Sequence, residues 1–200
     1  MSRPDLVQPL RDALARAGKP SSDYDLNPET KLARNRTLRE AAVLVPVMVQ
    51  NGVLNVILTK RSSALKHHPG QISFPGGKRE DSDKTLEDAA LREAWEEIGL
   101  DRNQVEVLGC LPPHETVTNF TVTPVLGLIR DDFHSKPDPS EVAEAFLVPL
   151  SHVMDPDRFQ VQSRRWMGQR RYYYVVPFGP YYIWGATARI LRALADRMAP

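Results

Sequence analysis

The chain has 200 residues, a length that fits one domain, or one domain with short extensions, around a single hydrophobic core. Its 26 lysine and arginine residues nearly cancel its 25 aspartate and glutamate residues, so the global charge predicts neither a nucleic-acid partner nor a membrane-surface binder. The longest apolar stretch, residues 41–49, falls far short of the roughly 20 residues of a membrane span, and we expect a cytoplasmic protein.

The N-terminal part of the chain predicts a helix followed by an arm. Residues 4–17 place Leu6, Leu10 and Leu14 at helical spacing, which is typical of a short amphipathic helix. The Pro, Ser, Asp and Asn residues that follow favour a linker or a wrapping arm. We therefore expect an N-terminal helix and linker arm in residues 1–36 and the main domain in residues 37–200.

The main domain begins with a predicted hairpin and has a helix near its middle. Residues 41–49 and 53–59 are β-rich runs separated by Asn51-Gly52, the strongest short hairpin signal. A helix is predicted from residue 83 to 98 and ends at Gly99. Further strands are predicted at 104–111, 121–129, 143–148, 159–166 and 172–176, with a last helix at about 186–197. Strands on both sides of a central helix indicate an α/β fold in which a mixed sheet packs between helices.

The central helix gathers acidic side chains. A rotation of about 100° per residue puts Glu93, Glu96 and Glu97 on one face, within an arc of roughly 100°. The opposite side carries an apolar stripe suited to packing on a sheet. It consists of Leu91, Ala94, Trp95 and Ile98.

The crowded carboxylates favour a hard divalent cation such as magnesium or manganese, since these ions prefer oxygen ligands. A solvated acidic face is the alternative. The turn before the helix, Phe74-Pro75-Gly76-Gly77-Lys78, favours the cation, because paired glycines let the backbone approach a ligand or offer a carbonyl to a metal. We also expect Cys110, which has apolar neighbours, to be a small buried hydrophobic residue.

The loop and helix together resemble the Nudix box, Gx5Ex7REUxEExGU with U aliphatic. The second half matches at six positions, which are Arg92, Glu93, Glu96, Glu97, Gly99 and Leu100. The first half departs, because Asp83 stands where the box has Glu and eight residues, one more than usual, separate it from Arg92.

This departure resembles the coenzyme A pyrophosphatase branch of the Nudix hydrolases. That branch carries a segment like LLTxR(S/A)x3Rx3Gx3FPGG ahead of the box, and residues 57–77 match it except for Ile57 and Lys66. Weaker similarity continues through residues 122–125, 141–150 and 183–188. The resemblance implies a Nudix-type α/β/α sandwich and metal-dependent hydrolysis of coenzyme A or acyl-CoA to 4′-phosphopantetheine, or its acyl form, and adenosine 3′,5′-bisphosphate.

The resemblance also implies roles for individual residues. Metal ligands would be Glu93, Glu96, Glu97 and the carbonyl of Gly77. The catalytic residues would be Glu93, Glu141 and Arg92, where either Glu93 or Glu141 accepts a proton from water and Arg92 orients the carboxylates. Glu144 and Glu115 are the alternatives to Glu141 as the acid from a later loop. Substrate phosphates, including a 3′-phosphate, would meet Lys60, Arg61, Lys66 and Gly76.

Other functions stay open on the sequence alone. A Nudix hydrolase of ADP-ribose or dinucleoside polyphosphates, or a non-catalytic nucleotide-sensing Nudix domain, would share the box. The basic and aromatic run from Arg164 to Tyr174 could stack the bases of a single strand, but a hairpin around Gly168 with one buried face is the interpretation we prefer. A homodimer is compatible with the sequence, which does not decide it.

Overall fold

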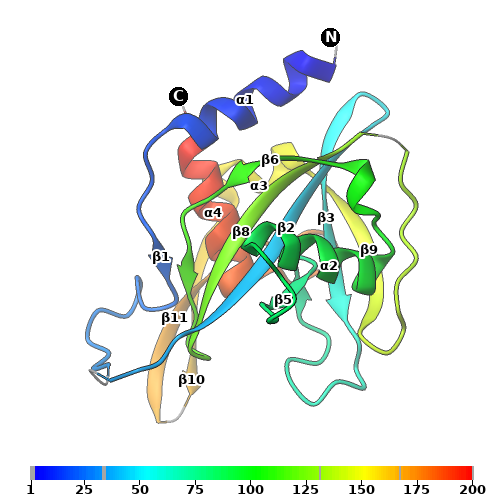
Figure 1. Cartoon of the computed structure of the whole chain (residues 1–200). Coiled ribbons are helices and arrows are strands. Elements are labelled where there is room, and N and C mark those ends of the chain that lie inside the picture. Colours follow the sequence, from blue (N-terminus) through cyan, green and yellow to red (C-terminus); the bar gives the residue numbers. More distant parts are fainter. Residues whose placement is uncertain (1–2, 33–34, 131, 167, 200) are drawn as a thin grey trace.

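A mixed β-sheet lies at the centre of the computed structural model, which describes residues 3–32, 35–130, 132–166 and 168–199 (Figure 1). Within these residues it has nine strands, which are β1 (Ser21–Ser22), β2 (Arg39–Gln50), β3 (Val53–Arg61), β4 (Ile72–Ser73), β5 (Gly76–Lys78), β6 (Val105–Cys110), β7 (His114–Glu115), β8 (Phe120–Ile129) and β9 (Val142–Pro149). The main path runs β1-β7-β8-β2-β3-β4, with β5 beside β2, β6 beside β8 and β9 beside β3. The β2–β8 pair is parallel and the β2–β3 pair antiparallel, so the predicted mixed sheet is confirmed.

The β2–β3 hairpin forms as the sequence predicts. Asn51 and Gly52 at its turn have φ angles of 51° and 74°, the left-handed region that an Asn-Gly pair adopts at low cost. Alternate residues of β2 then face opposite sides of the sheet. Val45 and Val47 enter one hydrophobic cluster, and Leu44 and Met48 enter the other.

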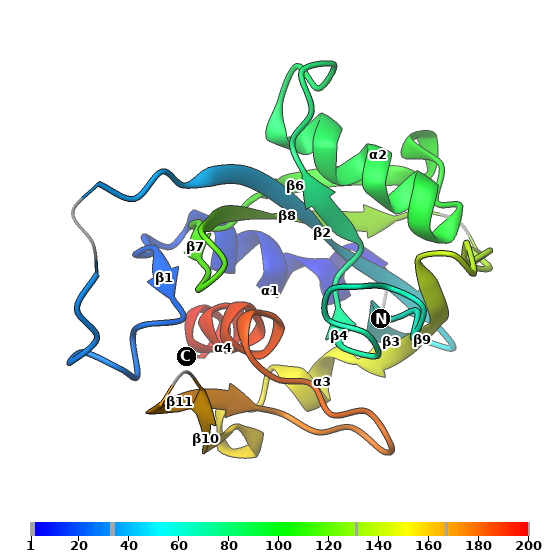
Figure 2. The same ribbon diagram turned by 90° about the horizontal axis from the view of Figure 1, so that it is seen from below.

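The helices cover both faces of this sheet, as Figure 2 shows. They are α1 (Arg3–Ala15), α2 (Leu86–Ile98), α3 (Leu150–Val153) and α4 (Ala186–Met198), with short 3-10 helices η1 (Arg102–Gln104) and η2 (Pro156–Arg158). One cluster joins α2 to the sheet, whereas the other brings α1, α3 and α4 to the opposite face. The α/β/α sandwich expected from the sequence is therefore confirmed. No helix of the described residues has both the length and the apolarity needed to cross a membrane.

The N-terminal segment is attached to the domain at two places. Leu10 and Ala13 of α1 are buried in the same cluster as Leu191 and Leu194 of α4. Strand β1, within the predicted arm, pairs with β7, where the Ser21 hydroxyl lies 2.9 Å from Nδ1 of the buried His114. The arm therefore follows the surface of the domain.

A second, smaller sheet is the hairpin of β10 (Gln160–Trp166) and β11 (Gln169–Val175), which confirms the predicted hairpin. The expected buried face is wrong for β10, because residues 160–165 are exposed. The expectation for Cys110 is wrong, because this residue is exposed. It ends β6, which pairs only with β8 in the described sheet, and its thiol lies 3.8 Å from a carboxylate oxygen of Glu87. Burial and Glu87 raise the pKa of the Cys110 thiol.

Candidate active site

The acidic helix begins three residues later than predicted. Thr85 is its N-cap, and the Thr85 side chain accepts a hydrogen bond from the backbone N–H of Asp88. The helix ends at Ile98, and Gly99 adopts the left-handed conformation with φ 71°, as predicted. Because Asp83 precedes the helix, its side chain is free to bind a residue of the next turns.

Strand β5 provides the surface on which the carboxylates rest. A side chain at Gly77 would place its Cβ 2.5 Å from a carboxylate oxygen of Glu93, so only glycine lets this carboxylate approach the strand. The neighbouring Gly76 has φ 154° and lies against the backbone of Ala42 and Val43. Its N–H donates a hydrogen bond to Oε2 of Glu97 at 3.3 Å. The glycine pair thus makes room for two glutamates.

The space beside the two glycines rotates the helix about its axis relative to the orientation that the sequence predicts. Glu97 is buried, with 2% of its surface exposed, whereas Trp95 is 56% exposed. The prediction that Trp95 packs on the sheet is therefore wrong, although Leu91, Ala94 and Ile98 are buried as expected. The helix turns Glu93 and Glu97 toward β5 because the two glycines leave space there, and Trp95 is turned outward in exchange.

Arg92 connects the acidic residues. Its guanidinium donates two hydrogen bonds to the carboxylate of Asp83, at 3.1 and 3.0 Å, and it also binds Glu93 at 3.0 Å and Glu96 at 2.9 Å. This hydrogen bonding lowers the pKa of Asp83 and raises that of Arg92. Asp83, the residue that departs from the box, therefore fixes Arg92, and Arg92 in turn holds Glu93. The sequence did not predict this contact, because Asp83 and Arg92 lie nine residues apart in the chain.

The two inner carboxyl groups have unusual proton affinities. Burial, and then the charge of Glu93, raise the pKa of Glu97 to about 8. The pKa of Glu93 is also raised, mainly by burial, although Arg92 opposes this. Without a positive charge between them, two such groups do not both ionise readily at neutral pH. The site therefore stabilises a cation or protons.

The segment that precedes the glycine pair folds back beside these carboxylates. The backbone of Arg61, at the end of β3, bonds to Gln71 and Gly70, at 3.0 and 3.1 Å, and so closes the loop between them. The charge of Arg61 lowers the pKa of Glu97, which places the guanidinium near the buried carboxyl group. Its Nε is buried and has no hydrogen-bond partner within the described part of the chain. An anion bound here would satisfy this donor.

The other two basic residues of the predicted phosphate cluster lie apart from this contact. Lys60 and Lys66 are exposed. In residues 3–32, 35–130, 132–166 and 168–199, neither side chain forms a hydrogen bond or an ion pair. The structure therefore brings Arg61 and Gly76 to the carboxylates and leaves both lysines at the surface.

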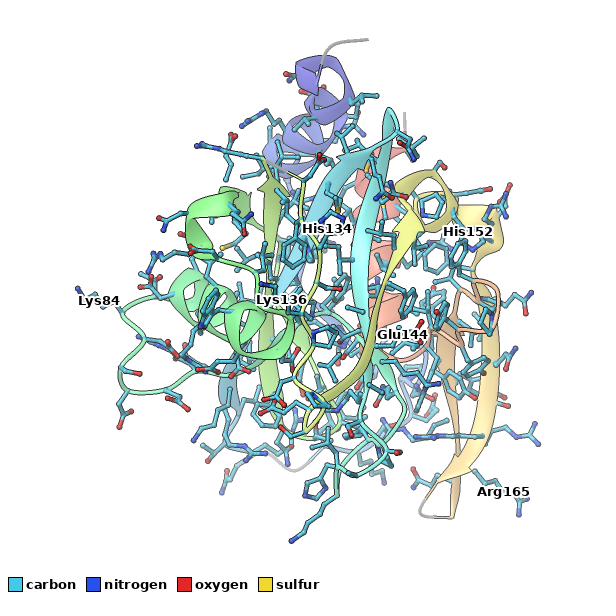
Figure 3. All side chains as sticks on the ribbon, turned by 90° about the vertical axis from the view of Figure 1, so that its right-hand side faces the viewer. Lys84, His134, Lys136, Glu144, His152 and Arg165 are labelled. Carbon is cyan, nitrogen blue, oxygen red and sulfur yellow. The ribbon has the colours of Figure 1, made fainter. Side chains whose placement is uncertain are left out.

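Of the three acids considered for a later loop, Glu141 lies nearest the inner carboxylates. Its charge raises the pKa of both Glu93 and Glu97, and its backbone carbonyl accepts a hydrogen bond from Ser62 at 2.8 Å. Glu144, labelled on β9 in Figure 3, instead accepts a hydrogen bond from the hydroxyl of Tyr181 at 2.5 Å. Glu115 pairs with Arg36. Glu141 is thus the exposed acid that faces the site.

The donor set fits a hard divalent cation. Glu93 and Glu97 would supply oxygen ligands, and burial raises the pKa of both because it disfavours their negative charge when no cation is near. Within the described residues, no three His, Cys, Asp or Glu side chains already stand in a geometry that encloses a metal ion. Binding would therefore require side-chain rotation, and Glu96, held by Arg92 and half exposed, would have to turn to take part.

Comparison with known proteins identifies the family of this chain. The family model of the NUDIX domain matches residues 38–169. A protein of Enterobacter sp. (strain 638), described as "Uncharacterized Nudix hydrolase NudL", is 41% identical over 157 residues, which cover 78% of this chain and 81% of that protein. A protein of Klebsiella pneumoniae (strain 342) with the same description is 38% identical over 185 residues, 87% of this chain and 96% of its own.

Solved structures share the fold. The Nudix hydrolase RenU from M. smegmatis is 26% identical with a TM-score of 0.50, and the similarity covers 60% of this chain and 83% of that protein. A MutT/nudix family protein from Enterococcus faecalis has a TM-score of 0.54 at 16% identity, covering 85% of this chain and 65% of its own. The second likeness concerns the fold alone.

Proposed function

This chain belongs to the Nudix hydrolase family, and we propose that the diphosphate it cleaves is that of coenzyme A or an acyl-CoA. In the proposed reaction, water adds to one phosphorus atom and the P–O bond of the anhydride breaks. The products are 4′-phosphopantetheine, or its acyl form, and adenosine 3′,5′-bisphosphate.

One observation carries the choice of substrate. Residues 57–77 resemble the segment typical of the coenzyme A branch, and two of them act on Glu97: the Gly76 N–H donates a hydrogen bond to its carboxylate, and the charge of Arg61 lowers its pKa. A segment with no part in catalysis would have no reason to bring a buried guanidinium donor to this place. This arrangement supports the proposal that the segment contacts the diphosphate of the substrate.

Nudix hydrolases generally need divalent metal ions. In this chain Glu93, Glu96, Glu97 and the carbonyl of Gly77 would hold magnesium or manganese, which neutralises phosphate charge and lowers the pKa of water when bound.

The remaining groups act on the substrate and on protons. Arg61 offers its guanidinium to a diphosphate oxygen, and a charge-assisted bond of this kind contributes about 1.5–3 kcal/mol. Arg92, anchored by Asp83, holds Glu93 at its position against Gly77. Glu141, exposed at the edge of the site, accepts the proton of the attacking water.

A substrate comparison tests this proposal. Purified protein with magnesium is incubated with coenzyme A, ADP-ribose and diadenosine polyphosphates, and the products are identified by mass. We expect the highest kcat/KM for coenzyme A or an acyl-CoA, with adenosine 3′,5′-bisphosphate among the products. A higher kcat/KM for ADP-ribose or a dinucleoside polyphosphate would show that the substrate assignment is wrong and that the chain is a Nudix hydrolase of another nucleotide.

A further inference from the structure

A second pocket lies apart from the carboxylates, between the β10–β11 hairpin and the start of α4. The cavity of this pocket has a volume of about 130 Å³. Cationic and aromatic side chains form much of its wall, together with one glycine. They include His68, Arg164, Arg171, Tyr173, Trp184 and Gly185.

The aromatic rings of the pocket are arranged around a guanidinium. Trp184 and Tyr173 meet edge to face, with ring centroids 5.2 Å apart. The Cζ atom of Arg164 lies 4.3 Å from the centroid of Trp184 and 5.9 Å from that of Tyr173. Flat rings and a planar cation are the surfaces on which a nucleobase stacks, at about 1–3 kcal/mol per base.

The pocket also lies at the N-terminal end of α4. Gly185, with φ 65°, is the N-cap of this helix of 13 residues, and no side chain caps it. The first N–H groups of a helix and its dipole favour an anion, and Arg164 and Arg171 add positive charge at the same pocket. The pocket therefore combines a stacking surface with a place for a phosphate.

The walls of the pocket are fixed by contacts from distant parts of the chain. Asn27 of the N-terminal arm exchanges two hydrogen bonds with the backbone of Tyr172, at 2.9 and 2.8 Å. The backbone of Trp184 forms an isolated antiparallel β-bridge with Val175, the last residue of β11. The one acid of the wall, Asp23, is engaged by His114 at 3.1 Å and by the N–H of Val117 at 2.9 Å. The two arginines of the wall outnumber this single carboxylate, so the pocket keeps a net positive charge.

Side chains of residues 57–77, the segment before the acidic helix, lie between this pocket and the active site. Burial is the main cause that lowers the pKa of His68, and the positive charges of Arg61 and Arg164 lower it further, so both arginines lie near His68. The side chain of Gln71 reaches to within 3.9 Å of the position of a Cβ at Gly185. A row of groups thus runs from Glu97 through Arg61 and His68 to Arg164.

From this arrangement we propose that the pocket binds the nucleoside end of the substrate, with its base against Trp184 and Tyr173 and its phosphate monoester at Arg164 and the start of α4. The identity of the nucleotide, an adenosine that carries a 3′-phosphate, rests on the proposed function. Arg61 then serves the diphosphate, and Arg164 serves the 3′-phosphate.

Equilibrium binding with a metal chelator present tests the pocket without turnover. The probes are adenosine 3′,5′-bisphosphate, adenosine 5′-monophosphate and inorganic phosphate. Arg164→Gln is compared with Arg165→Gln, because Arg165 is the next residue of the same strand and points away from the body of the molecule (Figure 3). We expect Arg164→Gln to weaken binding of the bisphosphate by roughly 10- to 150-fold, the effect of one lost charge-assisted contact, and Arg165→Gln to leave it unchanged.

A second variant tests the stacking surface. Binding of the bisphosphate should quench tryptophan fluorescence, and Trp184→Phe should abolish most of the quenching while retaining affinity within a few fold, because a phenyl ring still stacks. Trp184→Ala should lose the affinity. Circular dichroism and thermal unfolding verify that each variant is folded, and Arg164→Ala, which also removes the charge, replaces Arg164→Gln if that variant does not fold.

Steady-state kinetics separate this inference from the proposed function. Arg164→Gln should raise KM for coenzyme A more than for dephospho-coenzyme A, with kcat retained. Hydrolysis of coenzyme A with equal KM changes for both substrates would overturn the inference and leave the function intact. Bisphosphate binding that depends on Arg164, in a protein that does not cleave coenzyme A, would support the pocket and overturn the function. Equal losses in Arg164→Gln and Arg165→Gln, or tighter binding of a single-stranded oligonucleotide than of the bisphosphate, would also overturn the inference.

Discussion

The backbone N–H of Gly76 donates a hydrogen bond to Oε2 of Glu97 at 3.3 Å, and this contact joins the glycine turn to the acidic helix. It holds a carboxyl group in a buried position, with only 2% of its surface exposed. Burying such a group costs free energy unless it is protonated or paired with a cation. The turn and the helix therefore build a site that is completed by positive charge.

Replacement of Glu97 tests its role in hydrolysis. We predict that Glu97→Gln keeps the fold but lowers the hydrolysis rate by at least about 100-fold, because the amide preserves the shape and removes one negative ligand. Turnover at saturating magnesium and circular dichroism check the two parts. An unaltered rate would remove Glu97 from the metal site.

The same residue should make the stability of the metal-free protein depend on pH. The pKa of Glu97 is raised from 4.5 to about 8, so its protonated form stabilises the fold, fully below about pH 4.5, and this contribution is lost as the pH rises through about 8. We predict a lower melting temperature at pH 8 than at pH 5 with a chelator present, and recovery on adding magnesium. Glu97→Gln should flatten this dependence, and Glu29→Gln, an exposed control, should not.

A methyl group at Gly77 should displace the neighbouring carboxylate. The added Cβ would lie 2.5 Å from Oε1 of Glu93, so Gly77→Ala moves that group away from the strand. We predict a fall in kcat of at least about tenfold, with KM changed much less, since the loss concerns the reacting centre. Normal kcat in a folded Gly77→Ala protein would contradict the close approach as a requirement for catalysis.

Replacement of Glu141, in the loop before β9, and of Glu144, in β9, should affect the pH dependence of kcat differently. If Glu141 is the general base, Glu141→Gln lowers kcat with little change in substrate binding and flattens the acidic limb of the pH–rate profile. Glu144→Gln is the control, because Glu144 is bound to Tyr181 instead. A normal profile for Glu141→Gln together with an inactive Glu93→Gln enzyme would move the base onto the Nudix helix.

Arg61 should act on the diphosphate that all substrates of this class share. Its guanidinium lies near Glu97, so Arg61→Gln should lower kcat/KM for coenzyme A and for dephospho-coenzyme A by a similar factor, roughly 10- to 150-fold. Parallel kinetics with the two substrates measure this. A larger loss of kcat/KM for coenzyme A than for dephospho-coenzyme A would show instead that Arg61 recognises the 3′-phosphate.

The sequence by itself determined the local elements and the chemistry of the box. Asn51-Gly52 predicted the first hairpin, and Gly99 predicted the end of the acidic helix, because both depend on backbone preferences of a few neighbouring residues. The spacing of Arg92, Glu93, Glu96 and Glu97 indicated the candidate catalytic helix for a similar reason, since these residues lie close together in the chain.

Tertiary structure decided which sides of these elements are buried and which distant residues meet. Helical periodicity placed Trp95 inside and all three glutamates outside, whereas the space left by Gly76 and Gly77 turned Glu97 inward and Trp95 outward. Hydrophobicity alone does not predict this rotation, because it depends on the surface that the helix packs against. The meeting of Arg164 with Trp184 likewise arises from the pairing of β11 with the chain before α4, a contact between residues that local sequence patterns do not connect.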